Sequence, residues 1–298
     1  MIEPIRGSTS VAHEPSVWRA LYANRYLSWT RRKAARFIKP LLPKSARWVK
    51  IRGGILEGSY ICAELRHGEK SYWLGAFEPE IQSTLQMLSR QNRDLNCVYD
   101  VGAHIGFHSM AFARCFPRAR VIAFEPNPRN YERLKLNIQR NALAGRTTLL
   151  PQAVSDRSEE AQFYLGESTW SGGLVRQHRD NYSLNLYVLT TTLDDVVFRQ
   201  AFPPPELIKI DAEGAEAQVI RGGMQVLREH KPAIIAELHH AETAPEVLAA
   251  LVNIGYEIEP LGDEETGYPG KEEATGHFLA AHPSSTSKMR CRRPSNLI

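Results

Sequence analysis

Acidic and histidine side chains follow two apolar runs in the second half of the chain. The run 207–210 ends at Asp211, and the run 233–236 is followed by Glu237 and His239. If both runs are neighbouring parallel strands, their carboxyl ends lie at one edge of the sheet and these side chains converge. A carboxylate or an imidazole placed there can remove the proton of an alcohol. Asp211 and His239 are therefore candidate bases, and Glu237 is a third candidate catalytic group.

Other roles are open for these side chains. Asp211, Glu237 and His239 could instead hold a hard cation such as Mg²⁺, which would acidify a substrate hydroxyl, although we do not predict a metal. Glu213 precedes Gly214, and an acid at that place can also cap a helix, so catalysis and capping are equally open for it. For Asp211 and Glu237 we favour a functional role, because ending two buried strands in unpaired carboxylates is costly.

A glycine-bounded turn follows an earlier apolar run. The β-rich run 97–101 contains Asp100, and Gly102 and Gly106 enclose a turn that leads into a helix-like segment, 107–115. A dinucleotide site needs G-x-G-x-x-G, because a pyrophosphate must lie against bare backbone at a helix N-terminus. The second glycine of that pattern is missing, which disfavours an NAD-dependent oxidoreductase.

An acid beside this turn repels phosphate but attracts an ammonium. S-adenosylmethionine (SAM) has an ammonium, a ribose diol and an adenine, and it has no phosphate. Glu125, after the run 120–124, would accept both ribose hydroxyls, and Asp156, after a third run, would accept from the adenine amino group. For His104 a turn-capping role is favoured over catalysis. The predicted cofactor-binding residues are Asp100, Gly102, His104, Gly106, Glu125, Asn127 and Asp156.

These residues require strands that alternate with helices. Apolar runs predict strands at 98–101, 121–124, 147–150, 207–210 and 233–237. Helices are predicted at 107–116, 128–141, 215–229 and 244–254. This alternation favours an α/β fold with a mainly parallel sheet and helices on both faces. The glycine-rich interval 155–195 predicts hairpins or a flexible insertion beside the ligand-binding edge.

Four segments are predicted along the chain. Residues 1–50 are a basic, partly helical N-terminal extension. Residues 51–95 are a small α+β prelude or lid, with short strands at 51–61 and 70–74 and a helix at 79–90. Residues 96–282 are the domain that carries the site, and residues 283–298 are expected to be a disordered basic tail.

Positive charge is concentrated at the N-terminus of this 298-residue chain, whose formal net charge is +4. Residues 1–52 hold 12 of the 37 Lys and Arg but only 2 of the 33 Asp and Glu. A basic helix over 29–42, with an apolar stripe at Trp29, Phe37 and Ile38, could contact anionic lipid, nucleic acid or glycan. A solvated helix is favoured, so peripheral membrane contact stays open and nucleic-acid binding is disfavoured.

The four cysteines, Cys62, Cys97, Cys115 and Cys291, form no C-x-x-C pair, which argues against a zinc or disulfide framework. No apolar stretch is long enough to span a bilayer, and residues 1–16 lack a secretory pattern. We therefore expect a reducing, cytoplasmic compartment.

Six blocks of the sequence carry a family resemblance: 99–106, 124–128, 153–156, 191–195, 208–216 and 232–239. Together they resemble the FkbM-type family of SAM-dependent methyltransferases over residues 96–260, and the Lys-Ile-Asp-Ala-Glu-Gly-Ala-Glu block at 209–216 is the most specific. The resemblance implies the Rossmann-like class I fold, with seven strands and one antiparallel edge strand. It also implies O-methylation of a hydroxyl on a sugar, glycan or secondary metabolite. It supports Asp100, Gly102 and Glu125 as SAM contacts and settles no catalytic residue; where the family usually has Asn, this chain has His104.

Two other function classes remain as alternatives. The basic N-terminus suggests an RNA methyltransferase. The Asp-Ala-Glu-Gly sequence at 211–214 replaces the Asn/Asp-Pro-Pro-aromatic motif of base-amino methylation, which leaves ribose methylation open. A non-catalytic scaffold with the SAM fold is expected to have lost its cofactor acids, and Asp100, Glu125 and Asp156 are all present.

Overall fold

Four central strands are buried along almost their whole length. The computed structural model describes residues 45–65, 69–91, 94–166, 172–175, 182–261 and 276–285. The four strands are β3 (Cys97–Val101), β4 (Arg120–Phe124), β10 (Leu207–Ile210) and β11 (Ala233–Leu238). Among their residues only Arg120 is exposed. Strands that are covered on both faces must be apolar on both, which explains the near-continuous apolar runs.

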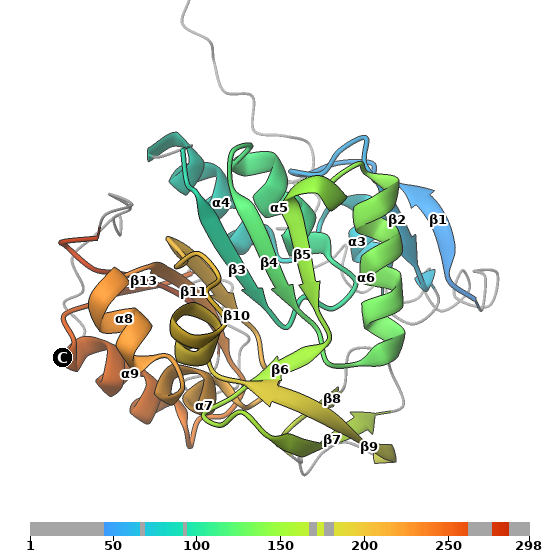
Figure 1. Ribbon diagram of the computed structural model, residues 1–298. Coiled ribbons are helices and arrows are strands. Elements are labelled where there is room, and N and C mark those ends of the chain that lie inside the picture. The colour runs from blue at the N-terminus through green and yellow to red at the C-terminus, as the bar shows by residue number, and fades with distance from the viewer. Residues whose placement is uncertain are drawn as a thin grey trace, which may run out of the picture. The chain divides into compact units, whose positions relative to one another are not determined.

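These strands form the centre of a seven-stranded sheet (Figure 1). Its order is β12 (Glu257–Pro260), β13 (Gly276–Ala281), β11, β10, β3, β4 and β5 (Thr147–Leu150). The pairs from β11 to β5 are parallel, and β13 is antiparallel to both of its neighbours. The mainly parallel α/β sheet of the class I fold is therefore confirmed. The antiparallel strand lies one place in from the edge, because β12 pairs outside it.

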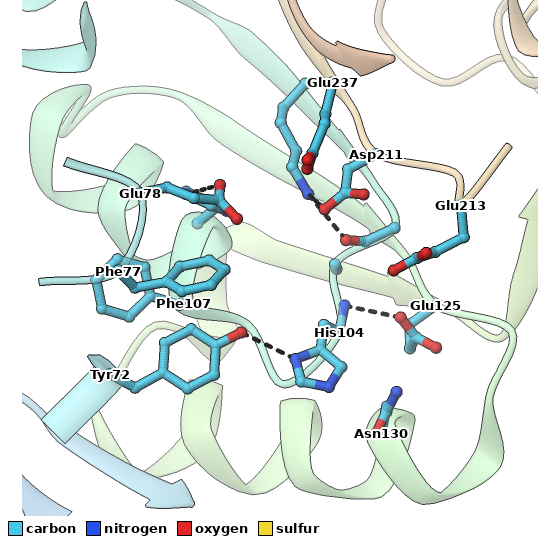
Figure 2. A pocket seen from close by; sticks show the side chains of 14 residues that line it. Tyr72, Phe77, Glu78, His104, Phe107, Glu125, Asn130, Asp211, Glu213 and Glu237 are labelled. Carbon is cyan, nitrogen blue, oxygen red and sulfur yellow. Dashed lines mark hydrogen bonds and ion pairs between the residues drawn. The ribbon is translucent and has the colours of Figure 1, made fainter. Parts of the chain in front are cut away.

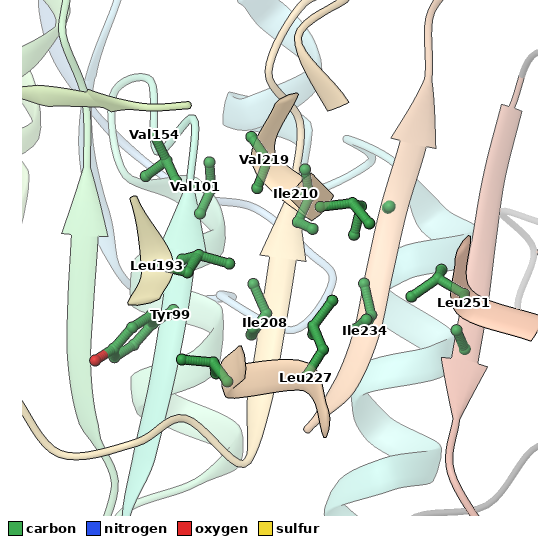
Figure 3. Packing of buried hydrophobic residues seen from close by; sticks show 14 of the residues in the cluster. Tyr99, Val101, Val154, Leu193, Ile208, Ile210, Val219, Leu227, Ile234 and Leu251 are labelled. Atoms are coloured by element: carbon green, nitrogen blue, oxygen red, sulfur yellow. The ribbon is translucent and has the colours of Figure 1, made fainter. Parts of the chain in front are cut away.

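Helices cover both faces of this sheet. On one face lie α7 (Glu216–Arg221), α8 (Met224–His230) and α9 (Ala244–Asn253). Their apolar residues, among them Val219, Leu227 and Leu251, pack with strand residues in one core cluster (Figure 3). On the other face, α5 (Phe107–Cys115) contacts β3 and β4, and α4 (Pro79–Gln91) contacts α5. After β4 the chain forms α6 (Pro128–Arg140).

A hairpin occupies the interval 155–195, as predicted. The antiparallel strands β7 (Glu160–Gly166) and β9 (Tyr182–Thr191) form it. With β6 (Gln152–Val154) and β8 (Gly172–Gly173) they make a four-stranded sheet of order β6-β9-β7-β8. A Cβ on Gly173 would lie 3.1 Å from the carbonyl oxygen of Glu213, so the hairpin sheet lies against the residues that follow β10.

The segment before β3 differs from the sequence prediction. The strands β1 (Arg47–Lys50) and β2 (Tyr60–Ala63) pair antiparallel. Turns lie between them, over most of the range 51–61 in which the sequence predicts a strand. Residues 70–74 form the helix α3 (Lys70–Leu74), so the strand predicted there is wrong. A helix this short has too few residues to show helical spacing, and its Tyr-Trp pair favours a strand. The left-handed Gly75, with φ 70°, ends it.

The helix predicted over 215–229 is broken at Gly222 and Gly223, between α7 and α8. A Cβ on Gly222 would lie 2.0 Å from the carbonyl oxygen of Ser155, so a close backbone approach requires glycine there. A short 3₁₀ helix, Ala144–Arg146, and a π-helical turn, Asp195–Arg199, complete the elements.

The basic helix predicted over 29–42 and most of the tail predicted over 283–298 lie outside the described residues. Within the residues that are described, no helix has the length and apolar character needed to cross a membrane.

Candidate active site

The turn after β3 depends on two glycines. Gly102 and Gly106 have φ values of 75° and 90°, in the left-handed region that favours glycine. A Cβ on Gly102 would lie 1.8 Å from the carbonyl oxygen of Asp211, and one on Gly106 would lie 2.5 Å from Leu134 Cδ1. The turn therefore packs directly against the residue that follows β10, and local geometry requires both predicted glycines.

Glu125 follows β4 and faces this turn. Its carboxylate accepts hydrogen bonds from the backbone N–H of His104 at 2.7 Å and of Asn127 at 2.9 Å. Burial raises the pKa of this carboxyl to about 7, although the two backbone donors act to lower it. The donors fix the orientation of the carboxylate, and each oxygen keeps a lone pair for a further donor. The side chain of Asn127 caps α6 by accepting from the Arg129 N–H at 3.0 Å.

His104 links the turn to α3. Its φ of 51° lies in the left-handed region, where His and Asn are enriched among residues other than glycine. The Tyr72 hydroxyl lies 3.0 Å from His104 Nδ1. The Tyr72 ring in turn stacks on Phe107, with a centroid distance of 5.2 Å. His104 therefore joins the turn to the segment before β3, a role beyond the turn cap that the sequence predicts.

A cavity of about 210 Å³ lies at the carboxyl ends of the central strands. Figure 2 shows Glu125, Asp211, Glu213 and Glu237 along one side of the cavity and the aromatic rings on the other side, where Glu78 also lies. The aromatic wall consists of Tyr72, Phe77 and Phe107. The other lining residues are Glu78, Gly102, Ala103, His104, His108, Glu125, Asn130, Lys209, Asp211, Glu213 and Glu237.

A second cavity, of about 30 Å³, shares Gly102 with the first. Its lining is almost entirely apolar and includes Phe163 and Leu174 from the hairpin sheet. The predicted insertion therefore contributes directly to the site. The other lining residues are Val101, Phe124, Pro126, Gln152, Ala153, Val154, Ala212 and Ala215.

A buried lysine organises the acids of β3 and β10. Lys209 Nζ donates to Asp211 Oδ2 and to the carbonyl oxygen of Gly102, each at 3.0 Å. Asp100 Oδ1 lies 3.8 Å from the same nitrogen, and its Oδ2 accepts from Ser109 Oγ at 2.5 Å. Burial alone would raise the pKa of Asp211, but the Lys209 ammonium outweighs it and holds this pKa well below its usual range. Asp100 is fully buried and lies outside the cavity lining, so it contacts Lys209 and does not face the cavity.

His239 lies among four carboxylates. Its Nδ1 is 2.9 Å from Glu216 Oε1. Its Nε2 is 3.6 Å from Asp211, 3.7 Å from Glu213 and 3.8 Å from Glu237. Burial acts to lower the pKa of His239, but the bond to Glu216 and the carboxylates around Nε2 raise it to about 10. The structure therefore brings the three predicted catalytic residues together, with His239 protonated at neutral pH.

Glu213 also lines the cavity. Burial, and then the charge of Asp211, raise the pKa of Glu213 to about 8. The sequence leaves open whether Glu213 caps a helix. In the structure Ala215 is the N-cap residue of α7, so Glu213 does not have this role.

Asp156 lies apart from the other predicted site residues. Its carboxylate forms an ion pair with Arg221 at 3.2 Å, and it lines neither cavity. The structure therefore gives Asp156 a partner on α7 in place of the predicted cofactor contact.

Five residues of the site escape the sequence analysis: Tyr72, Glu78, His108, Lys209 and His277. Lys209 has a signal, because a lysine inside the buried run Leu-Ile-Lys-Ile must be paired with acids. No pattern in the sequence connects Glu78 with His277. Glu78 directly precedes α4, near the start of the described residues, and His277 lies on β13, near their end.

Among the residues that the structure describes, two groups of three side chains could hold a metal ion. One is the predicted set Asp211, Glu237 and His239, and the other is Glu78, Glu237 and His277. In each group the ligand atoms lie within 4.8 Å of one another.

The chain is similar to known methyltransferases. The model of the methyltransferase FkbM domain matches residues 100–258, more than half of the chain. The hexuronic acid methyltransferase AglP of Haloferax volcanii is 26% identical over 194 residues, which cover 64% of this chain and 77% of AglP. The 31-O-demethyl-FK506 methyltransferase FkbM of Streptomyces tacrolimicus is 28% identical over 205 residues, 59% of this chain and 77% of that protein.

Among solved structures, the methyltransferase FkbM of Methylobacillus flagellatus KT aligns with a TM-score of 0.45 and 19% identity, over 63% of this chain and 44% of that chain. The range that the family model matches contains the glycine turn, Glu125, Asp211 and Glu237. The chain therefore belongs to the FkbM family of methyltransferases.

Proposed function

We propose that the protein transfers the methyl group of SAM to a hydroxyl of a sugar or of another small natural-product acceptor. The observation that carries this proposal is the orientation of Glu125. Two backbone donors hold its carboxylate in the wall of the same cavity that contains the acids around His239. One cavity thus offers a cofactor end and an acid–base end, which suits a transfer between two bound molecules.

At the cofactor end, the free lone pairs of Glu125 would accept both hydroxyls of the ribose. The small apolar cavity beside Gly102 suits the adenine ring, which Phe163 and Leu174 of the hairpin sheet would help to enclose. Gly102 leaves its backbone uncovered between the two cavities, so the rest of the cofactor can pass close to the turn.

At the other end, a carboxylate must take the proton of the acceptor hydroxyl. The O–CH₃ bond forms as the S–CH₃ bond breaks, the sulfur keeps the electron pair, and the hydroxyl proton passes to the protein. Asp211 is a weak base, because Lys209 holds its pKa low. Glu213, with a pKa of about 8, is closer to the value that suits a base at neutral pH. We therefore assign the base role to Glu213 and the positioning of Glu213 to Asp211, Glu237 and protonated His239.

Two further observations support an acceptor of this kind. The names of the two relatives refer to a hexuronic acid and to 31-O-demethyl-FK506. The aromatic wall of Tyr72, Phe77 and Phe107 supplies apolar surface opposite the acids, as expected for a ligand with both apolar and hydroxyl-bearing faces.

The described cysteines Cys62, Cys97 and Cys115 are buried free thiols, which supports the predicted reducing, cytoplasmic compartment.

Labelled SAM tests this proposal when it is incubated with the purified protein and with separate pools of uronic acids, neutral glycosides, macrolides and RNA. We expect label in a methyl ether of a sugar or natural product, stable to mild base, and no label with Glu213→Gln. Base-labile label would indicate a methyl ester and would contradict the hydroxyl acceptor. Label that appears in RNA alone would favour the ribose methyltransferase alternative.

A further inference from the structure

Three buried atoms without a hydrogen-bond partner lie together at one end of the large cavity. They are Glu78 Oε2, His108 Nε2 and His277 Nε2. In the part of the chain that the structure describes, only four other buried side-chain atoms lack such a partner. A buried polar atom without a hydrogen bond is costly, and one ion bound between Glu78 Oε2 and His277 Nε2 would satisfy two of the three.

We propose that Glu78, Glu237 and His277 bind a divalent transition-metal ion at this end of the cavity. Glu78 Oε2 lies 3.8 Å from His277 Nε2, and Glu237 Oε2 lies 3.3 Å from the same nitrogen. Ligand bonds of about 2.0–2.2 Å in tetrahedral geometry place neighbouring ligand atoms about 3.3–3.6 Å apart. The spacing of these atoms is therefore close to that of ligands around one ion.

The sheet and a further carboxylate hold His277 in the orientation that a metal ligand needs. Glu237 and His277 are direct cross-strand partners on β11 and β13, so their side chains share one face of the sheet. His277 Nδ1 lies 3.2 Å from Glu80 Oε1, which leaves Nε2 directed at Glu78 and Glu237. Metal-bound histidines commonly donate their second N–H to a carboxylate in this way.

His108 positions Glu78, the third proposed ligand. Its side chain is 4% exposed, and its Nε2 lies 3.4 Å from Glu78 Oε2. Since Glu78 precedes α4 and His108 lies on α5, this contact holds the carboxyl of one element in place from the other.

The other group of three is a poorer cation site. The ammonium of Lys209 lies 3.0 Å from Asp211 and already compensates its charge. His239 Nε2 is surrounded by Asp211, Glu213 and Glu237, and the acid–base chemistry proposed above uses Asp211 and Glu213. The orphaned atoms favour the cluster at Glu78 and His277, which has no lysine or arginine among its ion-pair partners in the described residues.

This metal site deepens the proposed function and rests on it for its role. Glu78 and Glu237 line the cavity, so an ion held by three protein ligands keeps an open position toward the acceptor. A bound hydroxyl there becomes more acidic. Glu78 and His277 both lie outside the residues that the family model matches, so two of the three ligands come from the flanking segments of this chain and Glu237 comes from within the matched range.

Metal titration of the full chain tests the site without any methyl acceptor. The protein is stripped with a chelator and titrated with Mn²⁺, and the free ion is followed by electron paramagnetic resonance. We expect one Mn²⁺ per chain, displaced by Zn²⁺ and weakly or not at all by Mg²⁺. His277→Ala and Glu78→Gln should each weaken binding about 10- to 100-fold. His239→Ala, which removes the other histidine ligand, and His230→Ala, on α8, should leave it within about threefold.

Two controls keep the result decisive. SAM binding by each variant shows that it is folded, and pulsed resonance spectra of the Mn²⁺-loaded wild type must show one coordinated histidine nitrogen. No stoichiometric binding to the wild type, or loss with His239→Ala but not with His277→Ala, would overturn the site. Metal binding without any methyl transfer would overturn the proposed function alone. Full methyl transfer in chelator, with no metal binding, would overturn only the metal site.

Discussion

The ammonium of Lys209 donates to the carboxylate of Asp211 at 3.0 Å from two positions earlier in the chain. Alternate positions along a strand face the same side of a sheet, so a lysine at the penultimate residue of β10 reaches the acid that follows the strand. Negative charge at the cavity wall is thus balanced from inside the protein. Lys209 thus favours an ionised Asp211, which is why we propose Glu213 and not Asp211 as the proton acceptor.

Replacement of this lysine should be strongly destabilising. Lys209→Met removes the buried cation that compensates the charges of Asp100 and Asp211, so we expect the free energy of unfolding to fall by about 3–5 kcal/mol. Urea denaturation measures this change. Lys135→Met, at an exposed position of α6, should change the stability by less than about 0.5 kcal/mol. Equal stabilities of the two variants would contradict the structural role of Lys209.

The rate of methyl transfer should rise with pH through the pKa of Glu213. A base works in its ionised form, so with a pKa of about 8 the rate increases from pH 6.5 to 8.5 and levels off near pH 9. Glu213→Gln should lower kcat about 10²–10⁴-fold and flatten this profile. Asp211→Asn should lower the rate and leave the rising limb in place. A rising limb that persists in Glu213→Gln would assign the base to another residue.

The glycine turn should tolerate no side chain at Gly102. An alanine there would bring Cβ within 1.8 Å of the Asp211 carbonyl oxygen and would strain a backbone with φ 75°. We expect Gly102→Ala to lower the thermal midpoint by more than about 4 °C and to abolish SAM binding. Gly145→Ala is the matched control, because nothing lies within 4 Å of its Cβ. Normal SAM binding by Gly102→Ala would show that the turn does not have the described packing.

The sequence predicts the central part of this fold well. Strands β3, β4, β5, β10 and β11 are covered on both faces or nearly so, and their apolar runs have the lengths that the structure shows. The prediction fails where tertiary contacts decide the local structure. A single-turn helix such as α3 has no periodicity to detect, and the break at Gly222 depends on the backbone of Ser155, far away in the sequence.

The sequence predicts only those residues of the candidate site that lie at the ends of the parallel strands. Glu125, Asp211 and His239 each follow a strand of the parallel sheet, Glu237 is the penultimate residue of β11, and the structure brings them to one edge. Asp100 also lies near the end of a strand, β3, but its carboxylate contacts Lys209 and Ser109 and does not line the cavity. Tyr72, Glu78 and His277 come from elements outside the alternating pattern, so only their packing against the sheet shows that they belong to the site.

Calorimetric titration of SAM into the purified protein tests the central claim most directly, with Glu125→Ala and Glu132→Ala titrated alongside. Glu132 is an exposed acid on α6 and serves as the matched control. We predict one SAM per chain and unchanged affinity in Glu132→Ala. We also predict a loss of at least about tenfold in Glu125→Ala, or about 1.4 kcal/mol. Wild-type affinity should fall below pH 7, because Glu125, with a pKa of about 7, then takes up a proton. The same SAM affinity in wild type and Glu125→Ala, or no binding to the wild type, would contradict the account.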